Sequence, residues 1–468
     1  MRLPMKHDER GLQITANSTN AVVAFDAAVA SYLNISRDTM ALIDKSLTLD
    51  PGLLMGHCLK GYLHALTNKP ELNERIAISL AAAKTSQIEH GATKRELQHV
   101  EALGALFLGN MSKATTLWES ILIDHPLDAI ALKIAHLHYF RLGDMPNLRD
   151  TSARVAYAWD PSIPAYGNFL GIRSFGLMET GDYRAAEDMG TRAVELAPSD
   201  LYAVHAVTHI HEMEGRWQDG LEWLNDPTRE WNSWNNFRFH VWWHYGLFLI
   251  ELERYDEALS NYDTRIRSEK TDFPTDTASA ISTLWRLEAV GVDVGGRWHE
   301  LGDIAERRLD DHQFAYFDSH TMVALAADGR KKATERMLKS LGHVKIKDNV
   351  TQSRIITEIG NPLCQAIHAY YNKDYGTTVD LMMPIRDNLY LIGGSQVQRD
   401  IFVQVLIHAA LKSDRHAVAR AIMAERIALK PNSAASWKLY ARALENNGET
   451  IAAIAALDRS AATLNVEY

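Results

Sequence analysis

Residues 180–200, TGDYRAAEDMGTRAVELAPSD, decide the fold that this chain adopts. Gly181 and Asp182 form a turn signal, the following residues have the apolar spacing of an amphipathic helix, and Pro198 closes the stretch. Glycine permits the backbone turn that ends one helix, and proline ends the next because it has no amide hydrogen to donate. The stretch therefore predicts a turn followed by the second helix of a helical hairpin.

The same punctuation recurs along the chain. The turn glycines are Gly109, Gly143, Gly181 and Gly215, at intervals of 34, 38 and 34 residues. The closing prolines are Pro126, Pro161 and Pro198, at intervals of 35 and 37 residues. Weaker copies precede and follow these, and no convincing strand alternation is present. We therefore predict an all-α protein, an α-solenoid of about nine or ten helical hairpins that forms a right-handed superhelix.

The repeats predict one domain. We expect a single continuous array over residues 1–468, since the chain has no low-complexity tract to act as a linker. Residues 1–20 are expected to be an irregular N-terminal segment, and residues 450–468 a C-terminal capping helix.

Residues 180–200 resemble the tetratricopeptide repeat (TPR). The small, aromatic and closing residues of that repeat match Gly181, Tyr183, Ala186, Ala193, Leu196 and Pro198. The small residues let the two helices of a hairpin approach, and the aromatic residue fills the gap to the next hairpin. The predicted hairpins are therefore TPR-like.

Longer stretches are similar to the tetratricopeptide repeat protein 38 family. They keep that family's order and read HAVTHIHEMEGRWQDGLEWL, HVWWHYGLFLIELERYDEALSNYD, FDSHTMVALAADG, GGSQVQRDIFVQVLIHAAL and ERIALKPNSAASWKLYARAL. The resemblance implies a long helical array with irregular repeats, and it implies no general biochemical activity. The family's recurrent positions match His205, His209, Glu212, His240, Trp243, His244, His320, Gly393, Gly394, Ser395, Gln398, Arg399 and Asp400.

Composition excludes some classes of partner. A formal net charge of −10 disfavours nucleic acid as the main partner, because neutralising phosphates needs a concentrated basic surface. No run approaches the roughly 18 apolar residues of a membrane span, and the first residues lack the apolar region of a signal peptide. We expect a cytoplasmic protein without a membrane partner, in which Cys58 and Cys364 are small core residues.

Two histidine pairs are the main candidate site. His205 and His209 are four residues apart, as are His240 and His244, so each pair lies on one face of its predicted helix. The pairs are separated by 35 residues, close to one repeat, and should therefore be neighbours in space. Glu212 lies on the same helix face as His205 and His209.

Three interpretations of this cluster stay open. As a metal site, His205, His209, His240 and His244 supply nitrogen donors for a divalent metal such as zinc, iron or manganese. In an acid–base site, a carboxylate would orient an imidazole that titrates near neutral pH. The catalytic candidates are then His209, Glu212, His244, Asp318 and His320. In the third interpretation the polar residues bind a ligand, with His205, His240 and Trp243 lining its pocket, or satisfy one another structurally.

The stretch IGGSQVQRDIF is a second candidate site. Gly393 and Gly394 permit a positive φ, and Ser395 is expected to cap the helix that follows. The first turn of that helix would present Gln398, Arg399 and Asp400, and a helix N-terminus beside an arginine can hold a carboxylate or phosphate. We therefore count Ser395, Gln398, Arg399 and Asp400 as ligand-binding candidates; an ordinary cap with a surface ion pair is the alternative.

Two function classes follow from these sites. The first is a TPR-like solenoid that binds a small polar or anionic ligand or a peptide in a concave pocket lined by His and Trp. The alternative is an enzyme, a hydrolase or lyase with or without a metal, that acts on a small polar substrate at the histidine cluster formed by His205, His209, His240, His244 and His320. The sequence leaves the choice, and a homo-oligomeric state, open.

Overall fold

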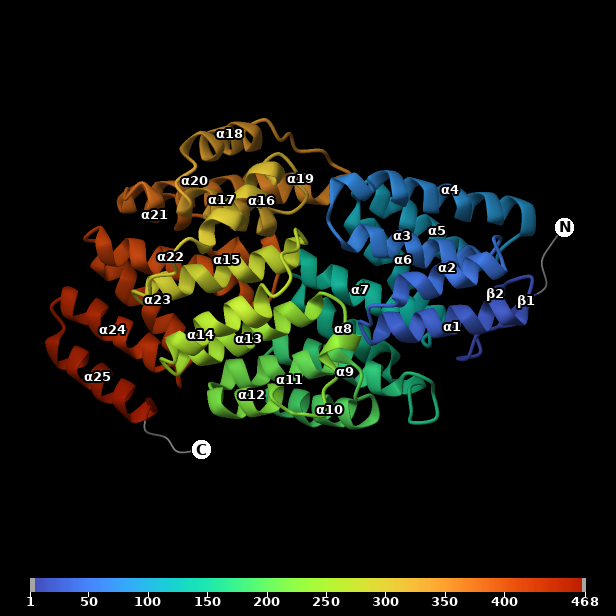
Figure 1. Cartoon of the computed structure of the whole chain (residues 1–468), viewed down its shortest axis with the longest axis horizontal. Coiled ribbons are helices and arrows are strands. Elements are labelled where there is room, and N and C mark those ends of the chain that lie inside the picture. The colour runs from blue at the N-terminus through green and yellow to red at the C-terminus, as the bar shows by residue number, and fades with distance from the viewer. Residues whose placement is uncertain (1–4, 465–468) are drawn as a thin grey trace. The chain divides into compact units, whose positions relative to one another are not determined.

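The computed structural model describes residues 5–464, and these residues confirm the predicted all-α fold (Figure 1). The first six pairs of helices are α1 (Thr19–Leu33) and α2 (Thr39–Leu49), α3 (Leu54–Leu66) and α4 (Asn73–His90), α5 (Lys94–Phe107) and α6 (Met111–Asp124), α7 (Ala129–Leu142) and α8 (Met145–Val155), α9 (Tyr166–Glu179) and α10 (Tyr183–Leu196), and α11 (Leu201–Glu214) and α12 (Trp217–Leu224). Short 3₁₀ segments occupy Pro70–Leu72, Ala156–Ala158 and Trp231–Ser233.

The second half of the chain continues the same pattern. Its pairs are α13 (Phe237–Glu251) and α14 (Tyr255–Asn261), α15 (Pro274–Ala289) and α16 (Arg297–Arg308), α17 (Ala315–Ala327) and α18 (Lys331–Leu341), α20 (Asn361–Tyr371) and α21 (Tyr375–Met382), α22 (Gln396–Lys412) and α23 (His416–Leu429), and α24 (Ala434–Asn446) and α25 (Thr450–Leu464). A short helix α19 (Thr351–Ile355) leads through a π-helical turn, Ile356–Gly360, into α20. A second π-helical turn, Tyr262–Ile266, follows α14, and a 3₁₀ segment, Arg386–Ile392, precedes α22.

Each of these twelve helix pairs turns on one residue in the left-handed region of backbone conformation. Those residues are Ile35, Asn68, Gly109, Gly143, Gly181, Gly215, Glu253, Gly291, Gly329, Lys373, Asp414 and Gly448. In the hairpin of residues 180–200, Asp182 N donates to Leu177 O at 3.0 Å across the turn. This six-residue bond ends the first helix and fixes the direction of the second. The predicted turns at Gly109, Gly143, Gly181 and Gly215 are confirmed.

The structure therefore contains more hairpins than the nine or ten that the sequence pattern indicated. The pair α3 and α4 is one that the pattern did not include, because its turn uses Asn68 with φ 54° in place of a glycine. Asparagine tolerates this conformation better than other residues that carry a Cβ atom. A repeat search based on glycine alone passes over such a turn.

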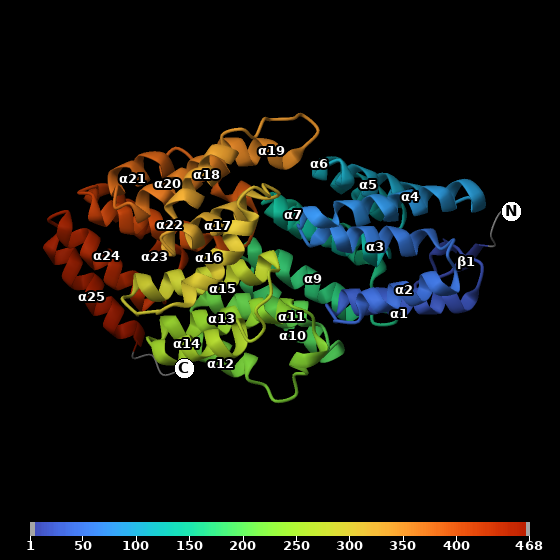
Figure 2. The same cartoon turned by 45° about the horizontal axis from the view of Figure 1, so that its top comes forward.

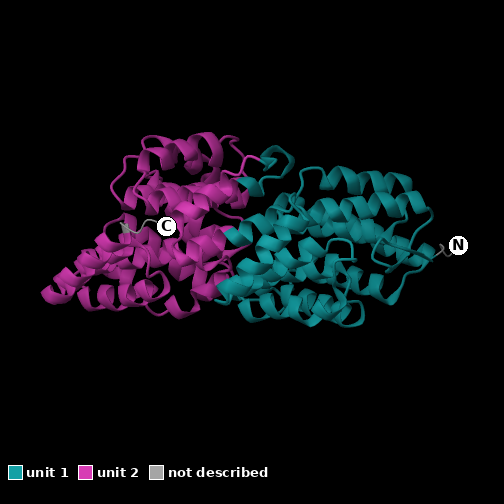
Figure 3. Ribbon diagram, turned by 90° about the horizontal axis from the view of Figure 1, so that it is seen from below, with its two compact units in different colours: residues 1–207, 228–238, 346–354 teal, residues 208–227, 239–345, 355–468 magenta. Residues whose placement is uncertain are grey.

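By its contacts the chain forms two compact units (Figure 3), residues 1–207, 228–238 and 346–354, and residues 208–227, 239–345 and 355–468. Hairpins occur in both units, and a single continuous array stays a prediction. In the first unit, strands β1 (Met5–His7) and β2 (Gln13–Thr15) pair antiparallel within the segment that was expected to be irregular. Glu96 holds this pair, because its carboxylate accepts hydrogen bonds from the amide and the hydroxyl of Thr15.

The second unit ends in the hairpin of α24 and α25, which pack side by side (Figure 2). Helix α25 agrees with the predicted C-terminal helix as far as Leu464, and residues 465–468 of that prediction, like residues 1–4 of the N-terminal segment, lie outside the described residues. Both cysteines are buried and unpaired, as expected of core residues. Among the described residues, no helix is both long and apolar enough to cross a membrane.

Close approach of α12 to α13 depends on Gly220. A Cβ atom on Gly220 would overlap the ring of Phe248, which is fully buried. We expect Gly220→Ala to lower the free energy of unfolding by about 1–3 kcal/mol, since the packed ring must move. Gly376→Ala, on α21 where an added Cβ meets no atom within 4 Å, is the matched control and should be neutral or slightly stabilising. Calorimetric melting of both variants tests this, and equal effects would contradict it.

Candidate metal centre

Helices α11 and α13 carry the two predicted histidine pairs, and their N-termini are fixed locally. The carboxylate of Asp200 accepts a hydrogen bond from the amide of Tyr202 at 2.9 Å, which caps the start of α11. The side chain of Asn235 accepts from the amide of Phe237 at 2.8 Å and does the same for α13. Within each helix, the four-residue spacing gives the two histidines of a pair a common direction.

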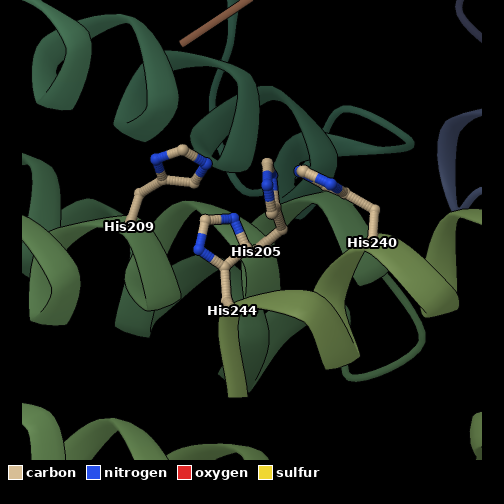
Figure 4. A group of neighbouring side chains, drawn as sticks. All are labelled: His205, His209, His240 and His244. Atoms are coloured by element: carbon tan, nitrogen blue, oxygen red, sulfur yellow. The ribbon is translucent and has the colours of Figure 1, made fainter. Parts of the chain in front are cut away.

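The four histidines form one cluster, in which their rings are turned toward one another (Figure 4). One potential ligand atom from each of His205, His209, His240 and His244 lies within 4.8 Å of all the others. The ring centroids of His209 and His244 are 4.4 Å apart, and those of His240 and His244 are 5.1 Å apart. All four side chains are at most 3% exposed. The predicted spatial neighbourhood of the two pairs is therefore present.

Burial keeps these imidazoles in the form that binds metal. It lowers the pKa of His240 to about 3, and it lowers the pKa of His209 well below its usual range, with smaller contributions from His240 and Lys430. At neutral pH both rings are therefore uncharged, and an uncharged imidazole has a nitrogen lone pair available for coordination. His240 Nδ1 lies 3.1 Å from Ser279 Oγ, a contact that orients the ring.

Trp243, a predicted ligand-binding residue, belongs to the wall of this cluster. Its ring stacks on His240 with centroids 4.9 Å apart and an interplanar angle of 20°. It also meets His244 nearly edge to face at 4.7 Å. The indole therefore restricts both histidines of α13 to a narrow range of orientations.

Charged residues that the sequence did not indicate surround the predicted Glu212. Lys430 Nζ donates to Glu212 Oε1 at 2.8 Å, and both side chains are buried. Burial raises the pKa of Glu251, while Lys430 and Arg426 act to lower it, and Ser433 Oγ donates to Glu251 Oε2 at 2.8 Å. Arg426 also forms an ion pair with Asp400, and Arg286 lies 3.8 Å from the same carboxylate.

We call Glu212, Glu251, Asp400, Lys430, Arg426 and Arg286 the charge network. Its three carboxylates balance its three cations when all six groups are ionised. The predicted Asp400 is part of it and pairs with cations inside the protein.

Asp318 and His320 are not brought together as an acid–base pair. Both are on α17, two residues apart, and therefore point in different directions. Asp318 Oδ1 lies 3.2 Å from His312 Nδ1, whereas His320 Nδ1 lies 2.8 Å from the carbonyl oxygen of Tyr316. Burial raises the pKa of Asp318 and lowers that of His320 to about 4. A shared catalytic role for these two residues would need a different geometry.

The second predicted site forms a helix cap. Gly393 and Gly394 have φ values of 83° and 81°, and Ser395 caps α22. The hydroxyl of Ser395 accepts from Gln398 N at 3.1 Å, and the side chain of Gln398 accepts from Ser395 N at 2.9 Å. Both side chains are thereby used by the cap, and Arg399 donates to the carbonyl oxygen of Gly394. These contacts favour the capping alternative for Ser395 and Gln398 over ligand binding.

Comparisons with known proteins find only distant structural likenesses. No protein family model matches the chain. Solved structures that align with it include the following three. The first is the APC/C hetero-tetramer Cut9–Hcn1, with 12% identity over 96% of this chain and 95% of that chain and a TM-score of 0.35. The second is Naa15/Naa10 bound to HypK-THB, with 14% identity over 95% of this chain and 64% of that chain and a TM-score of 0.25. The third is the TPR domain of P58(IPK), with 11% identity over 79% of this chain and 92% of that chain and a TM-score of 0.22.

At these TM-scores the likeness adds nothing to what the hairpins themselves show. The TPR-like fold depends on the twelve hairpins and their turns. The narrower resemblance to the tetratricopeptide repeat protein 38 family stays a prediction.

Buried neutral histidines make stability depend on pH. In the unfolded chain a histidine titrates near pH 6.5, whereas in the folded chain His320 titrates near pH 4. Below pH 6.5 the unfolded state therefore binds the extra proton, and stability falls by up to about 1.4 kcal/mol per pH unit for each such histidine. We expect His320→Phe to lose less stability than the wild type between pH 6.5 and pH 4.5, measured by thermal melting.

Comparing variants is necessary because the raised pKa values of Asp318 and Glu251 act in the opposite direction. His343→Gln, at an exposed position, is the control and should melt with the pH dependence of the wild type. Identical slopes for His320→Phe and the wild type would contradict the assignment.

The buried ion pair of Lys430 and Glu212 gives a second test. We expect Lys430→Met to cost about 3–5 kcal/mol of unfolding free energy, because it leaves a buried carboxylate without its counter-charge. Lys438→Met removes the partner of Glu253 in a largely exposed pair and should cost less than about 1 kcal/mol. Chemical denaturation of both variants distinguishes them; a Lys430 variant as stable as the Lys438 variant would show that Glu212 is not held by charge.

Proposed function

We propose that the protein binds one divalent transition-metal ion at His205, His209, His240 and His244. The observation that carries this proposal is the gathering of four buried imidazoles whose ligand atoms lie within 4.8 Å of one another. Four nitrogen donors around tetrahedral zinc, at metal–nitrogen distances of 2.0–2.1 Å, would be about 3.4 Å apart. Closing the cluster onto an ion therefore needs side-chain shifts of roughly 1 Å or less.

The donor set favours some metals over others. Imidazole nitrogen suits zinc, copper, iron and nickel, whereas magnesium and calcium prefer oxygen. Low pKa values at His209 and His240 remove the competition from protons at neutral pH. We infer a zinc-type ion as the occupant.

A metal-dependent enzyme is the second candidate function, favoured by the charge network next to the cluster. Glu212 follows His209 by three residues on α11, and its carboxylate is buried beside Lys430. Buried titratable groups of this kind cluster at catalytic sites more often than elsewhere in proteins. A zinc-type ion supplies a Lewis acid there, and the substrate class would be small and polar, as for a hydrolase or lyase.

A ligand-binding solenoid without catalysis is compatible with the same residues. Its ligand would be small, polar or anionic and would contact Trp243 and the histidines. A peptide in a concave groove, a cytoplasmic location and a homo-oligomer stay predictions.

Metal content of the purified chain tests the proposal directly. Native mass spectrometry with elemental analysis is expected to find one metal ion per chain, and His209→Ala/His244→Ala should lose it. His138→Ala is the matched control: His138 is also buried, but its Nδ1 lies 2.8 Å from the carbonyl oxygen of Ile134 on its own helix. Metal retained by the double variant, or absent from a wild-type protein that has been offered zinc, would refute the proposal.

Removal of the metal should also lower stability. An ion that binds only the folded state stabilises it by about 2.7 kcal/mol at 100 times its dissociation constant. We expect a chelator to lower the melting temperature of the wild type, and added Zn²⁺, but not Mg²⁺, to restore it. An unchanged melting temperature would mean that the four imidazoles hold the helices together without a metal.

A further inference from the structure

Arg286, on α15, is the centre of a second polar region in the residues of the second unit. Its guanidinium donates to Ser282 Oγ and to the carbonyl oxygen of Val397, the latter at 3.1 Å, and it lies 3.8 Å from Asp400. The Cζ atom is also 5.6 Å from the centroid of the Trp243 ring. The side chain is buried, so this positive charge acts through a medium that screens it poorly.

Three buried polar atoms near Arg286 have no hydrogen-bond partner among the described residues. They are Trp243 Nε1, His320 Nε2 and Glu212 Oε2, and these residues are at most 2% exposed. Each of these residues interacts with Arg286. The guanidinium lies near the ring of Trp243, and the charge of Glu212 raises the pKa of Arg286. Burial is the main cause of the low pKa of His320, and the charge of Arg286 lowers that pKa further. An unsatisfied buried polar group is costly, and three around one cation indicate a ligand site.

The hydrogen-bonding character of each atom is defined. Trp243 Nε1 can only donate. His320 Nδ1 faces the carbonyl oxygen of Tyr316 at 2.8 Å and must carry the ring proton, so Nε2 can only accept. Glu212 Oε2 belongs to a carboxylate whose other oxygen accepts from Lys430. The region therefore offers a cation and a donor together with a neutral and an anionic acceptor.

The charge network limits the net charge of the ligand. Its members, Glu212, Glu251, Asp400, Lys430, Arg426 and Arg286, sum to zero. Adding a net charge to a balanced and largely buried set of ions costs free energy that no counter-ion compensates. A ligand that carries one positive and one negative group meets both the charge balance and the donor and acceptor pattern.

We propose that Arg286, Trp243, His320 and Glu212 bind a small zwitterion, an α-amino acid. Its carboxylate would accept from the Arg286 guanidinium and Trp243 Nε1, and its ammonium group would donate to His320 Nε2 and Glu212 Oε2. None of these four residues is a proposed metal ligand, so the site goes beyond the proposed metal centre. It also adjoins that centre, because Trp243 stacks on His240 and Glu212 follows His209 on α11.

Saturation-transfer difference NMR on the full chain tests the proposal, with each common L-amino acid as the probe. The strongest binder is then compared with the amine that lacks its carboxylate and with the acid that lacks its amine. The amino acid is expected to bind at least about tenfold more tightly than either, because a site built for both groups rejects a ligand that leaves one unpaired. No binding by any amino acid, or equal binding by the acid, overturns the proposal.

Matched variants separate this site from a general effect on folding. Trp243→Phe and His320→Phe should each weaken binding roughly tenfold, since each removes one hydrogen bond and keeps a ring. The matched controls are Trp298→Phe and His138→Phe, which should bind as the wild type does. Trp298 Nε1 donates to Glu288 at 2.8 Å, and His138, like His320, has its Nδ1 against the carbonyl oxygen four residues earlier. Wild-type affinity in both site variants overturns the proposal.

Metal-loaded and metal-stripped samples keep the two proposals apart. Amino-acid binding is expected in both samples, because its four residues coordinate no metal. Binding in a chain that never holds metal supports this site while refuting the metal centre. Binding confined to the loaded sample shows that the metal holds the amino acid, and it overturns the assignment to Arg286, Trp243, His320 and Glu212.

Discussion

One residue in a left-handed conformation closes each of the twelve helix pairs, and the rest of the structure depends on it. These residues have φ values from 54° to 91° and recur at intervals of 33 to 44 residues. Each reverses the chain so that the second helix of a pair can pack on the first. The turns at Gly215 and Glu253 are 38 residues apart, so α11 and α13 hold equivalent places in successive hairpins. Histidine pairs that are 35 residues apart can meet only because of this spacing.

The sequence shows this constraint most clearly where it is met by glycine. Seven of the twelve turn residues are glycine, and the predicted turns fall among them. Ile35, Asn68, Glu253, Lys373 and Asp414 adopt the same conformation, which is unfavourable for a side chain with a Cβ atom. At Ile35 the turn is held by a hydrogen bond from Ser36 N to Ser31 O at 2.9 Å. Such turns are fixed largely by the contacts of the folded chain, and their residues give a weaker local signal than glycine does.

The candidate site divides in the same way. Local spacing predicted the histidines, because residues four apart on a helix share a face whatever surrounds them. The partners of the site are far away along the chain: Lys430 meets Glu212 across 218 residues, and Ser433 meets Glu251 across 182. Nothing in the stretch ALKPNS distinguishes Lys430 from a surface lysine at a helix end. Spacing also suggested Asp318 as a partner of His320, but side chains two residues apart on a helix diverge, and Asp318 meets His312 instead.

A purely structural role explains this interior poorly, because cheaper ways to pack the same helices exist. Apolar residues of similar volume stabilise a core at least as well as buried ion pairs do. Here α11, α13, α15 and α17 instead bury imidazoles, a guanidinium group and carboxylates. Helices α5 and α7 also bury polar groups, but Arg95 and His99 there pair directly with Asp128. Low pKa values at His209, His240 and His320 show that burial keeps these rings uncharged, with lone pairs that protons do not occupy at neutral pH. Uncharged lone pairs beside charges of both signs are what a bound metal ion and a small polar molecule each require. On this ground we propose that these helices bind such groups in addition to supporting the fold.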